Sequence, residues 1–561
     1  MAFVQTPPVL GNQFDQDRVL QSFLRRRVPQ DVLASMLPSL ARMGARTVGD
    51  LGAAAAAAYG EEPELVQWDA WGNRIDAIVV PEAWKLFARA AVEEGLIWTA
   101  YERASGEYSR LHQFALVYLF APSSKVYTCP LAMTDGCART LEVMAEPALR
   151  ERVLPRLVSR DPRTAWISGQ WMTERAGGSD VGLSETVARE TPEGWRLWGT
   201  KWFTSAVTAD VALTLGRPQE AGPGGRGLAL FLVETRDAQG RLNGIEVHRL
   251  KDKLGTRMVP TAELTLNGTP AIPVAGLSDG VRNITTMLNI TRTWNAVCSV
   301  ASLRRGIALA RDFAGRRFAF GAMLDRKPLH VDTLAEMQAE YEAAFHLTFH
   351  AVALLGRAET GVITAEETAL LRLLQPLAKL TTGRQAVAGA SETLEAFGGA
   401  GYIEDTGLPE ILRDAQVLSI WEGTTNVLAL DVLRALARTE ALSVFGGEVR
   451  RRAEAAVHET ALRGPAATAV AAMEHAERWL AAAGQRGAAC VEAGARRFAL
   501  TLGRTLALAL LVDHAAWALA HEGDPRPAAA ARRFARAGVD LLWAEDLGAE
   551  DAALLASDRT G

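Results

Sequence analysis

The chain of 561 residues contains few cysteines, and they follow no pattern that would join them. Its four cysteines, Cys129, Cys137, Cys298 and Cys490, are scattered and form no CxxC pair. A disulfide framework or a structural zinc site needs regularly spaced cysteines, so we expect neither. Free thiols suit a reducing compartment, and the chain is therefore expected to be cytoplasmic.

Long apolar runs and an excess of positive charge are also missing. The first residues carry acidic and amide side chains in place of an apolar signal core. No stretch reaches the roughly 18 apolar residues of a membrane span, so no membrane association is expected. The formal net charge of −5 gives no general attraction to nucleic acid or to anionic membranes.

Two local patterns that suggest ligands are incomplete. The glycine-rich stretch EAGPGGRG, at residues 220–227, lacks the Lys-Ser/Thr of a nucleotide P-loop, and we interpret it as a hairpin loop. His346 and His350 have the i, i+4 spacing of two metal ligands, but no HExxH glutamate accompanies them. We expect core or interface histidines and no metal site.

The residues that are present indicate several structural units. Hydrophobic residues make up 49% and charged residues 22% of the chain, as in globular proteins, and the length suffices for three or four units. Helical spacing predicts a helical domain over 1–165, with the alanine run 53–58 in a helix. Alternating segments between Gly/Pro-rich connections predict a β-domain over 166–280. Helical periodicity returns over 281–438 and in an Ala- and Arg-rich extension over 439–561.

Two motifs of the predicted β-domain suit a flat ligand. QWMTERAGGSDV contains adjacent glycines, which let a backbone approach a ligand closely, and the hydroxyls of Thr173 and Ser179. GTKWFTS offers Trp202 and, two residues later, Thr204, which a strand places on one face. Taken alone, the first motif is more often a simple turn, and the second is as often ordinary aromatic packing.

Two further motifs lie near the end of the predicted bundle. FGGAGY follows a long helix, and its glycines end that helix and expose backbone amides that can hold a pyrophosphate. IWEGTTN places Glu422 between Trp421 and Gly423. A carboxylate in apolar surroundings becomes a stronger base, as general-base catalysis requires. In isolation, a surface glutamate in a turn explains IWEGTTN equally well.

Together these motifs resemble the acyl-CoA dehydrogenase superfamily in order and spacing, and the helix–β–helix alternation over about residues 20–435 is similar to that family's fold. Within the superfamily the chain most resembles the AidB branch, named for the adaptive response to alkylation. That resemblance rests on LVQWDAWGNRID, GQWMTERAGGSDV, HRLKDKLG and the C-terminal extension. It implies a mainly α fold: a helical domain, a central β-barrel-like domain, a four-helix bundle and an appended helical domain.

The resemblance also implies FAD as the cofactor. Thr204 would bond the flavin N5 region while Trp202 shields one face of the ring. Arg317 and Phe320 would reach the FAD of a neighbouring subunit, which implies a homo-oligomer, a dimer or a tetramer. The residues that the resemblance assigns to FAD are Met172, Thr173, Gly178, Ser179, Trp202, Thr204, Arg317, Phe320, Gly398, Gly399, Thr424 and Asn426.

The implied reaction is the α,β-dehydrogenation of an acyl-CoA thioester. Glu422 would take the α-proton, the β-hydrogen would leave as hydride to flavin N5, and an acceptor such as an electron-transfer flavoprotein would receive the electrons. Other branches carry the base just before an arginine, but here Thr291 precedes Arg292, which favours Glu422. The bulk of Trp421 favours a short, branched or aromatic acyl group. The implied substrate residues are Ser179, Arg292, Trp421 and Gly423.

Departures from the family leave alternatives open. Arg175 stands where the family commonly has proline, so we expect a differently shaped loop. AidB-type proteins are associated with DNA and alkylation damage, a role that requires a basic surface. Residues 441–561 hold 14 Arg and no Lys against 15 Asp plus Glu, although several arginines could share a face. Solvated helix faces are the favoured interpretation; a DNA-associated flavoprotein and an oxidase- or monooxygenase-like enzyme are the alternatives.

Overall fold

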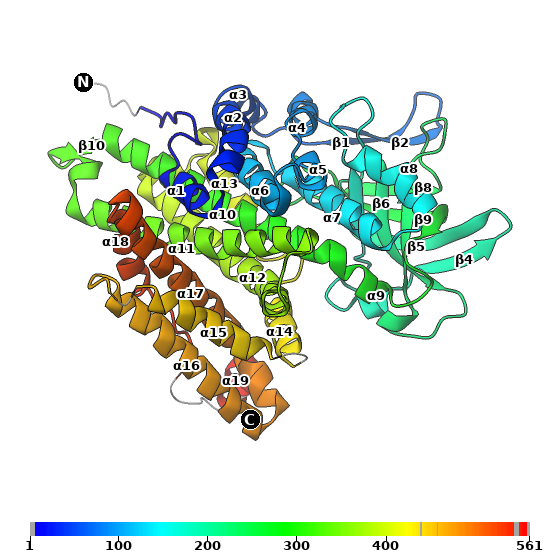
Figure 1. The fold of residues 1–561 in the computed structure, drawn as a ribbon. Coiled ribbons are helices and arrows are strands. Elements are labelled where there is room, and N and C mark those ends of the chain that lie inside the picture. Colours follow the sequence, from blue (N-terminus) through cyan, green and yellow to red (C-terminus); the bar gives the residue numbers. More distant parts are fainter. Residues whose placement is uncertain (1–5, 438–439, 457, 544–548, 558–561) are drawn as a thin grey trace. The chain divides into compact units, whose positions relative to one another are not determined.

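The computed structural model describes residues 6–437, 440–456, 458–543 and 549–557 (Figure 1). Contacts divide the chain into two compact units. Unit 1 comprises Met1–Val9, Leu303–Phe397 and Leu418–Gly561, and unit 2 comprises Leu10–Ser302 and Gly398–Val417.

The first part of unit 2 is helical, as predicted. Asp17 caps the first helix by accepting a hydrogen bond from Leu20 N at 3.0 Å. The alanine run lies mostly in α3, as expected from the high helix propensity of alanine. The helices are α1 (Arg18–Arg27), α2 (Gln30–Arg46), α3 (Asp50–Ala57), α4 (Glu82–Glu93), α5 (Trp98–Glu102), α6 (Ser109–Phe120), α7 (Thr128–Met144), α8 (Pro147–Leu157), α9 (Gly280–Asn283) and α13 (Leu408–Val417).

One hairpin in this region was not predicted from the sequence. Strands β1 (Glu64–Trp68) and β2 (Arg74–Val79) pair antiparallel. Asp69 builds their turn by accepting hydrogen bonds from Trp71 N and Asn73 N, both at 2.8 Å. Most side chains of the hairpin are exposed or half-buried, so its sequence lacks the regular alternation that marks a strand on a core.

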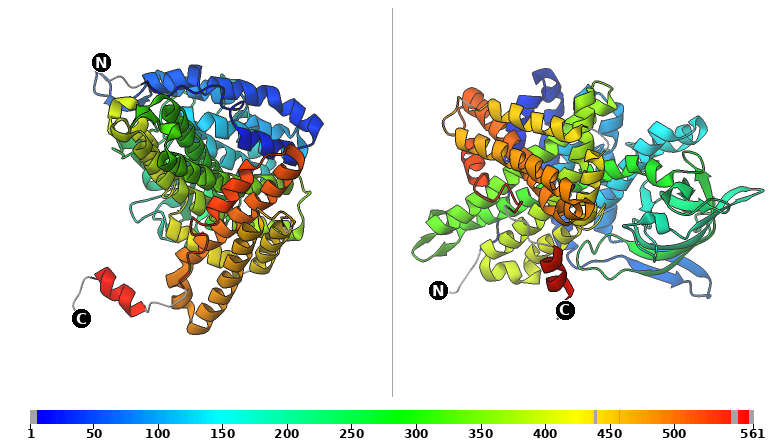
Figure 2. Two further views of the ribbon diagram at one scale, coloured as in Figure 1. Left: turned by 90° about the vertical axis from the view of Figure 1, so that its left-hand side faces the viewer. Right: turned by 90° about the horizontal axis from the view of Figure 1, so that it is seen from below.

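The β-domain of unit 2 is a sheet that closes on itself (Figure 2). The strand order is β3-β6-β4-β5-β9-β7; β7 pairs again with β6, and β8 pairs with β9. The return pairing makes the barrel-like domain that the resemblance implied. The stretch 220–227 joins antiparallel β6 and β7, which confirms the hairpin loop. The strands are β3 (Ser168–Trp171), β4 (Val187–Thr191), β5 (Gly194–Ser205), β6 (Val211–Pro218), β7 (Ala229–Glu234), β8 (Ile245–Leu250) and β9 (Thr261–Pro273).

Unit 1 is a helical core to which both the predicted bundle and the C-terminal extension contribute. Helix α17 packs against α11, α12, α14, α15 and α18, and also against α16. A capping box between Thr364 and Glu367 starts α12. The helices are α11 (Pro328–Glu359), α12 (Ala365–Ala396), α14 (Thr425–Leu436), α15 (Ala441–Glu454), α16 (Arg463–Arg486), α17 (Ala488–Glu522), α18 (Arg526–Phe534) and α19 (Ala549–Ser557), and α10 (Thr285–Arg316) has residues in both units.

Helix α17 corrects one expectation from the sequence. Among the described residues it alone is long and apolar enough to cross a membrane, whereas no such stretch was predicted from the sequence. Arg504 and Asp513 interrupt its apolar run, which hid its length from a count of consecutive apolar residues. Of the apolar window, 89% is buried inside the protein, as expected for the central helix of a core.

Candidate functional site

The first two motifs lie side by side in unit 2. The TERAGGSD segment follows β3, and GTKWFTS forms the end of β5. Trp202 N donates a hydrogen bond to the carbonyl oxygen of Thr173 at 3.0 Å. The pairing of β5 with β9 is irregular between Lys201 and Thr204, and such a bulge changes the direction of the side chains it carries. The fold thus brings together two segments that the sequence could only propose separately.

A buried ion pair fixes this junction. Lys201 is fully buried, and its Nζ donates to Glu174 Oε1 at 2.7 Å and to the Leu215 carbonyl at 3.0 Å. Glu174 also accepts hydrogen bonds from Thr186 Oγ1 and Glu185 N, both at 2.6 Å. Burial opposes the charge on Glu174, but Lys201 and these donors outweigh it and hold the pKa of Glu174 below its ordinary value. This pair was not predicted from the sequence.

The residues at this junction fit a flavin. Thr204 Oγ1 is buried and has no hydrogen-bond partner among the described residues, so its bonding capacity is left for a group outside the chain. A Cβ on Gly178 would lie 2.5 Å from Thr173 Oγ1, so the close approach of this loop requires glycine. Met172 is half-buried and Ser179 is exposed in the same loop.

Trp202 has two cations on its ring. Lys251 Nζ lies 3.7 Å from the ring centroid, and the Arg175 guanidinium lies 5.9 Å from it. Both distances fall within the range of a cation–π contact. Arg175, at the position where the resemblance led us to expect proline, therefore helps to hold the tryptophan.

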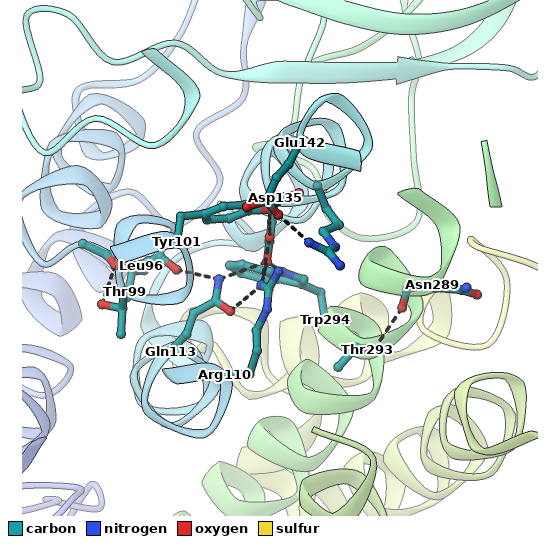
Figure 3. Close-up of polar contacts among 12 residues, drawn as sticks. Leu96, Thr99, Tyr101, Arg110, Gln113, Asp135, Glu142, Asn289, Thr293 and Trp294 are labelled. Carbon is teal, nitrogen blue, oxygen red and sulfur yellow. Dashed lines mark hydrogen bonds and ion pairs between the residues drawn. The ribbon is translucent and has the colours of Figure 1, made fainter. Parts of the chain in front are cut away.

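Arg292 lies on α10 two residues before Trp294, which belongs to a largely buried polar cluster. Asp135 accepts hydrogen bonds from Trp294 Nε1 at 2.7 Å and from Arg110 Nη1 at 2.8 Å (Figure 3). Gln113 and Tyr101 donate to the same carboxylate, at 2.9 and 2.8 Å. With four donors on one buried carboxylate, the cluster ties α10 to α6 and α7 next to Arg292, which is itself 8% exposed.

The glycines of FGGAGY also lie in unit 2. Gly398 has φ +60°, which glycine adopts without strain, and both Gly398 and Gly399 are exposed. A Cβ on either would meet nothing within 4 Å. The two glycines therefore leave open space above their backbone, as a phosphate-binding turn needs.

In unit 1, Glu422 lies in a strained turn between Trp421 and Gly423. Glu422 has φ 58° and Gly423 has φ 104°. A non-glycine residue with positive φ is uncommon, and such strain concentrates at functional sites. Lys379 of α12 is fully buried and donates to the Gly423 carbonyl at 2.6 Å, which helps to hold the turn. Lys379 was not predicted from the sequence, although a lone lysine within the apolar stretch LLQPLAKL is a usable signal.

The remaining assigned residues of unit 1 flank this turn or lie on a hairpin. Thr424 caps α14 by accepting a hydrogen bond from Val427 N at 3.4 Å, and Asn426 Oδ1 accepts one from Arg496 at 3.1 Å. Arg317 is half-buried just before the hairpin of β10 (Phe318–Ala319) and β11 (Ala322–Met323). Phe320, at the hairpin turn, is 93% exposed.

Metal ligands are not gathered anywhere in the part of the chain that the structure describes: no group of three His, Cys, Asp or Glu side chains there could hold an ion. His346 and His350 are buried residues of α11. The His346 ring lies 4.4 Å from the ring of His514 on α17, so these histidines belong to the core of unit 1.

Sequence comparisons match nearly the whole chain to known domains. Residues 169–269 match the acyl-CoA dehydrogenase middle domain, and residues 278–437 match the acyl-CoA dehydrogenase C-terminal domain. Residues 5–162 match the N-terminal domain of the adaptive response protein AidB. Residues 440–555 match a domain like the C-terminal domain of acyl-CoA dehydrogenase 11.

Individual proteins are similar over comparable lengths. Acyl-CoA dehydrogenase family member 11 of Caenorhabditis elegans is 42% identical over 528 residues, 91% of this chain and 86% of its own. The crystal structure of C. elegans ACDH-11 in complex with C11-CoA, 40% identical, has a TM-score of 0.94 and covers 100% of this chain and 96% of that chain. AidB of Escherichia coli is 33% identical over 67% of this chain and 69% of its own. A Bacillus anthracis acyl-CoA dehydrogenase complexed with FAD, 18% identical, shares the fold with a TM-score of 0.70 over 98% of this chain and 94% of that one.

Proposed function

The chain belongs to the acyl-CoA dehydrogenase family of FAD-dependent oxidoreductases, in its AidB-type branch, and on that premise we propose that it dehydrogenates an acyl-CoA thioester with Glu422 as the base. The strained turn at Glu422, held by Lys379, is the observation that supports this assignment most directly. Backbone strain has to be stabilised by the surrounding structure, and a plain surface turn would not need it.

The roles of the chain's own groups follow from their chemistry. Bound FAD supplies the acceptor for the hydride. Thr204 Oγ1, Thr173 and the glycine loop would hold it, and Arg292 would lie near the thioester. Glu422 would accept the α-proton of the substrate. The strained backbone at Glu422 and Gly423 would present an N–H to the thioester oxygen as charge develops there, a contribution that is typically large.

The length of the acyl chain has two competing indications. The C. elegans relative was crystallised with an eleven-carbon acyl-CoA, which supports a medium-length chain for a protein so similar over its full length. Trp421, half-buried beside Glu422, supports the short, branched or aromatic group expected from the sequence. We take the medium-length chain as the leading proposal and the smaller groups as its competitor.

An oligomer and a separate electron acceptor complete the proposal. Phe318 and Phe320 of the β10–β11 hairpin are 59% and 93% exposed. Exposed aromatic side chains that lie together mark an interface, which supports a dimer or tetramer through this hairpin. Light scattering should give a smaller assembly for Phe320→Ser than for the wild type. The acceptor, an electron-transfer flavoprotein in our proposal, follows from the family alone.

DNA binding, the alternative role, finds little support in the charges of the extension. Arg450 pairs with Glu477 at 2.7 Å, and Arg452 pairs with Asp513 at 2.6 Å. Arg533 pairs with Asp332 at 2.5 Å. Arginines that already have carboxylate partners contribute little to phosphate binding. A mobility shift that weakens steeply with salt would nevertheless restore this alternative.

Anaerobic mixing with a panel of thioesters tests the proposal. Butanoyl-, isobutanoyl-, 3-phenylpropanoyl-, undecanoyl- and hexadecanoyl-CoA should differ in how fast they bleach the oxidised flavin, with undecanoyl-CoA fastest. Glu422→Gln should keep FAD and lose bleaching, because the amide cannot accept the α-proton. Bleaching by none of the thioesters, or undiminished bleaching in Glu422→Gln, would refute the reaction or the base. Rapid oxygen consumption would indicate an oxidase.

A further inference from the structure

Unit 2 contains a cavity that the proposed reaction does not use. It lies between α4, α7 and α8 and the segments that lead into β3 and β6, and its volume is about 520 Å³. Small-molecule pockets commonly span about 300–1,000 Å³. None of the residues assigned to FAD or to acyl-CoA lines it.

The wall of the cavity is mainly apolar. Trp84, Leu131 and Leu157 line it and are almost fully buried, and Ile97 and Ile167 extend the apolar surface. A ligand with an apolar body would therefore gain from leaving water there, because burying apolar surface is favourable.

One residue of the cavity wall, Tyr127, carries a hydroxyl. Tyr127 is 2% exposed, and its ring packs edge-on against Trp84 at 4.6 Å. Its hydroxyl forms no hydrogen bond with any residue that the structure describes, although it lines the cavity. Lys125 and Val126, just before it, have φ 47° and 63°, a strained conformation for a β-branched residue. The hydroxyl oxygen is not sealed off inside the protein, so a ligand oxygen in the cavity could replace water as its partner.

A carboxylate shares this wall with Tyr127. Asp210 lines the cavity, and its Oδ2 accepts a hydrogen bond from Ile167 N at 2.8 Å. Burial raises the pKa of Tyr127, and the nearby charge of Asp210 adds to the effect, so the phenol stays protonated and is able to donate. A ligand hydroxyl could accept from Tyr127 and donate to Asp210 at once.

The cavity wall also carries positive charge. Lys85, Arg89 and Arg163 line it and are exposed. Lys85 pairs with Glu82 at 2.6 Å, and Arg163 pairs with Asp161 at 2.7 Å. Arg89 forms no ion pair or hydrogen bond with a described residue, so its guanidinium is available to an anion.

We propose that this cavity binds a hydroxylated apolar carboxylate. Its carboxylate would pair with Arg89, its apolar body would lie along Trp84 and Leu131, and its hydroxyl would bond to Tyr127 and Asp210. The site is separate from the catalytic one, and it selects for a polar group at each end of an apolar chain.

Calorimetric titration of the FAD-loaded protein with 10-hydroxydecanoate and with decanoate tests this proposal. Decanoate should bind about tenfold more weakly, because it forms no hydrogen bond with the Tyr127 hydroxyl or with Asp210. Tyr127→Phe, which keeps the ring against Trp84, should reduce the preference, because only the bond to Asp210 remains. Arg89→Gln should weaken both ligands about tenfold, whereas Arg241→Gln, an exposed arginine outside the cavity, should change neither.

Three results of the titrations would overturn the proposal, and a competition experiment supplies a fourth. These are the absence of binding by either compound, equal affinity of the wild type for both, and unchanged affinity in Arg89→Gln. Competition by undecanoyl-CoA would also overturn it, because the ligand would then occupy the acyl-CoA site. Flavin bleaching by acyl-CoA should be the same in Tyr127→Phe and the wild type, which separates this test from that of the proposed reaction.

Discussion

Two fully buried lysines, Lys201 in unit 2 and Lys379 in unit 1, each hold the backbone beside proposed site residues, but they bond to different groups. Lys201 pairs with the carboxylate of Glu174 and joins two motifs that are distant in sequence. Lys379 donates to the carbonyl of Gly423, in the turn that carries Glu422. The first contact balances one buried charge with another, and the second holds a strained peptide.

The difference predicts separate consequences for the two regions. Breaking a buried ion pair leaves a charge without compensation, which costs stability directly. Breaking the bond to Gly423 leaves a carbonyl unsatisfied and lets a strained turn relax, which displaces Glu422. We therefore expect the β-domain lysine to matter most for folding and FAD retention, and the helical lysine to matter most for turnover.

The largest effect is expected for Lys201→Met. Glu174 would remain buried without its cation, at a cost of about 3–5 kcal/mol. Urea unfolding should show a lower midpoint, and FAD should be lost at a lower temperature. The double variant Lys201→Met/Glu174→Gln should recover part of the loss, because the stranded charge is gone. Equal midpoints for Lys201→Met and the wild type would contradict the role of the pair.

Lys379→Met should separate turnover from stability. Loss of a hydrogen bond from a charged group costs about 1.5–3 kcal/mol, and we expect the bleaching rate to fall about 10- to 100-fold. FAD affinity should change little. Stopped-flow bleaching and flavin titration measure the two quantities. If Lys379→Met instead bound FAD weakly but bleached at the normal rate once saturated with FAD, Lys379 would matter for FAD retention and not for turnover.

Thr204→Val tests the unsatisfied hydroxyl of the flavin junction. Valine has nearly the same shape, and Thr204 Oγ1 has no partner among the described residues, so the FAD-free protein should unfold at the same urea concentration as the wild type. FAD should bind about tenfold more weakly, and its spectrum should shift, because a single hydrogen bond is lost. A large fall in the stability of the FAD-free form would show that the hydroxyl has a partner within the chain.

The smallest effect is expected at Asp414, a half-buried carboxyl that bonds to a backbone N–H and not to a lysine. It accepts from Thr256 N at 2.6 Å, and burial, with Glu410 nearby, raises its pKa to about 7. Because this pKa lies above the unfolded value, the folded protein binds the extra proton, and stability falls as pH rises through 7. The wild type should lose about 1 kcal/mol more than Asp414→Asn between pH 6 and 8. If the free energies of unfolding of the wild type and Asp414→Asn, measured in urea, changed in parallel with pH, this titration of Asp414 would be excluded.

The fold was largely predictable because its elements have strong local signals. Helical spacing and alternating strands separate the β-domain from its neighbours, and the glycine-rich stretch 220–227 has the composition of the loop that it forms. The hairpin of β1 and β2 was not predicted because its faces are only partly buried. Helix α17 was not recognised as a core helix because its burial depends on partners that lie far away in the sequence.

The sequence by itself determined the class of chemistry, because TERAGGSD, GTKWFTS, FGGAGY and IWEGT are short and depend little on the rest of the chain. It also identified Glu422 as the candidate base. Only the tertiary structure revealed what holds these motifs: Glu174 with Lys201, and Lys379 at Gly423. Burial and hydrogen-bond partners depend on three-dimensional neighbours, so they cannot be predicted from the position of a lysine in a strand or helix. The same reason kept the cavity of Tyr127 and Arg89 hidden until the chain was folded.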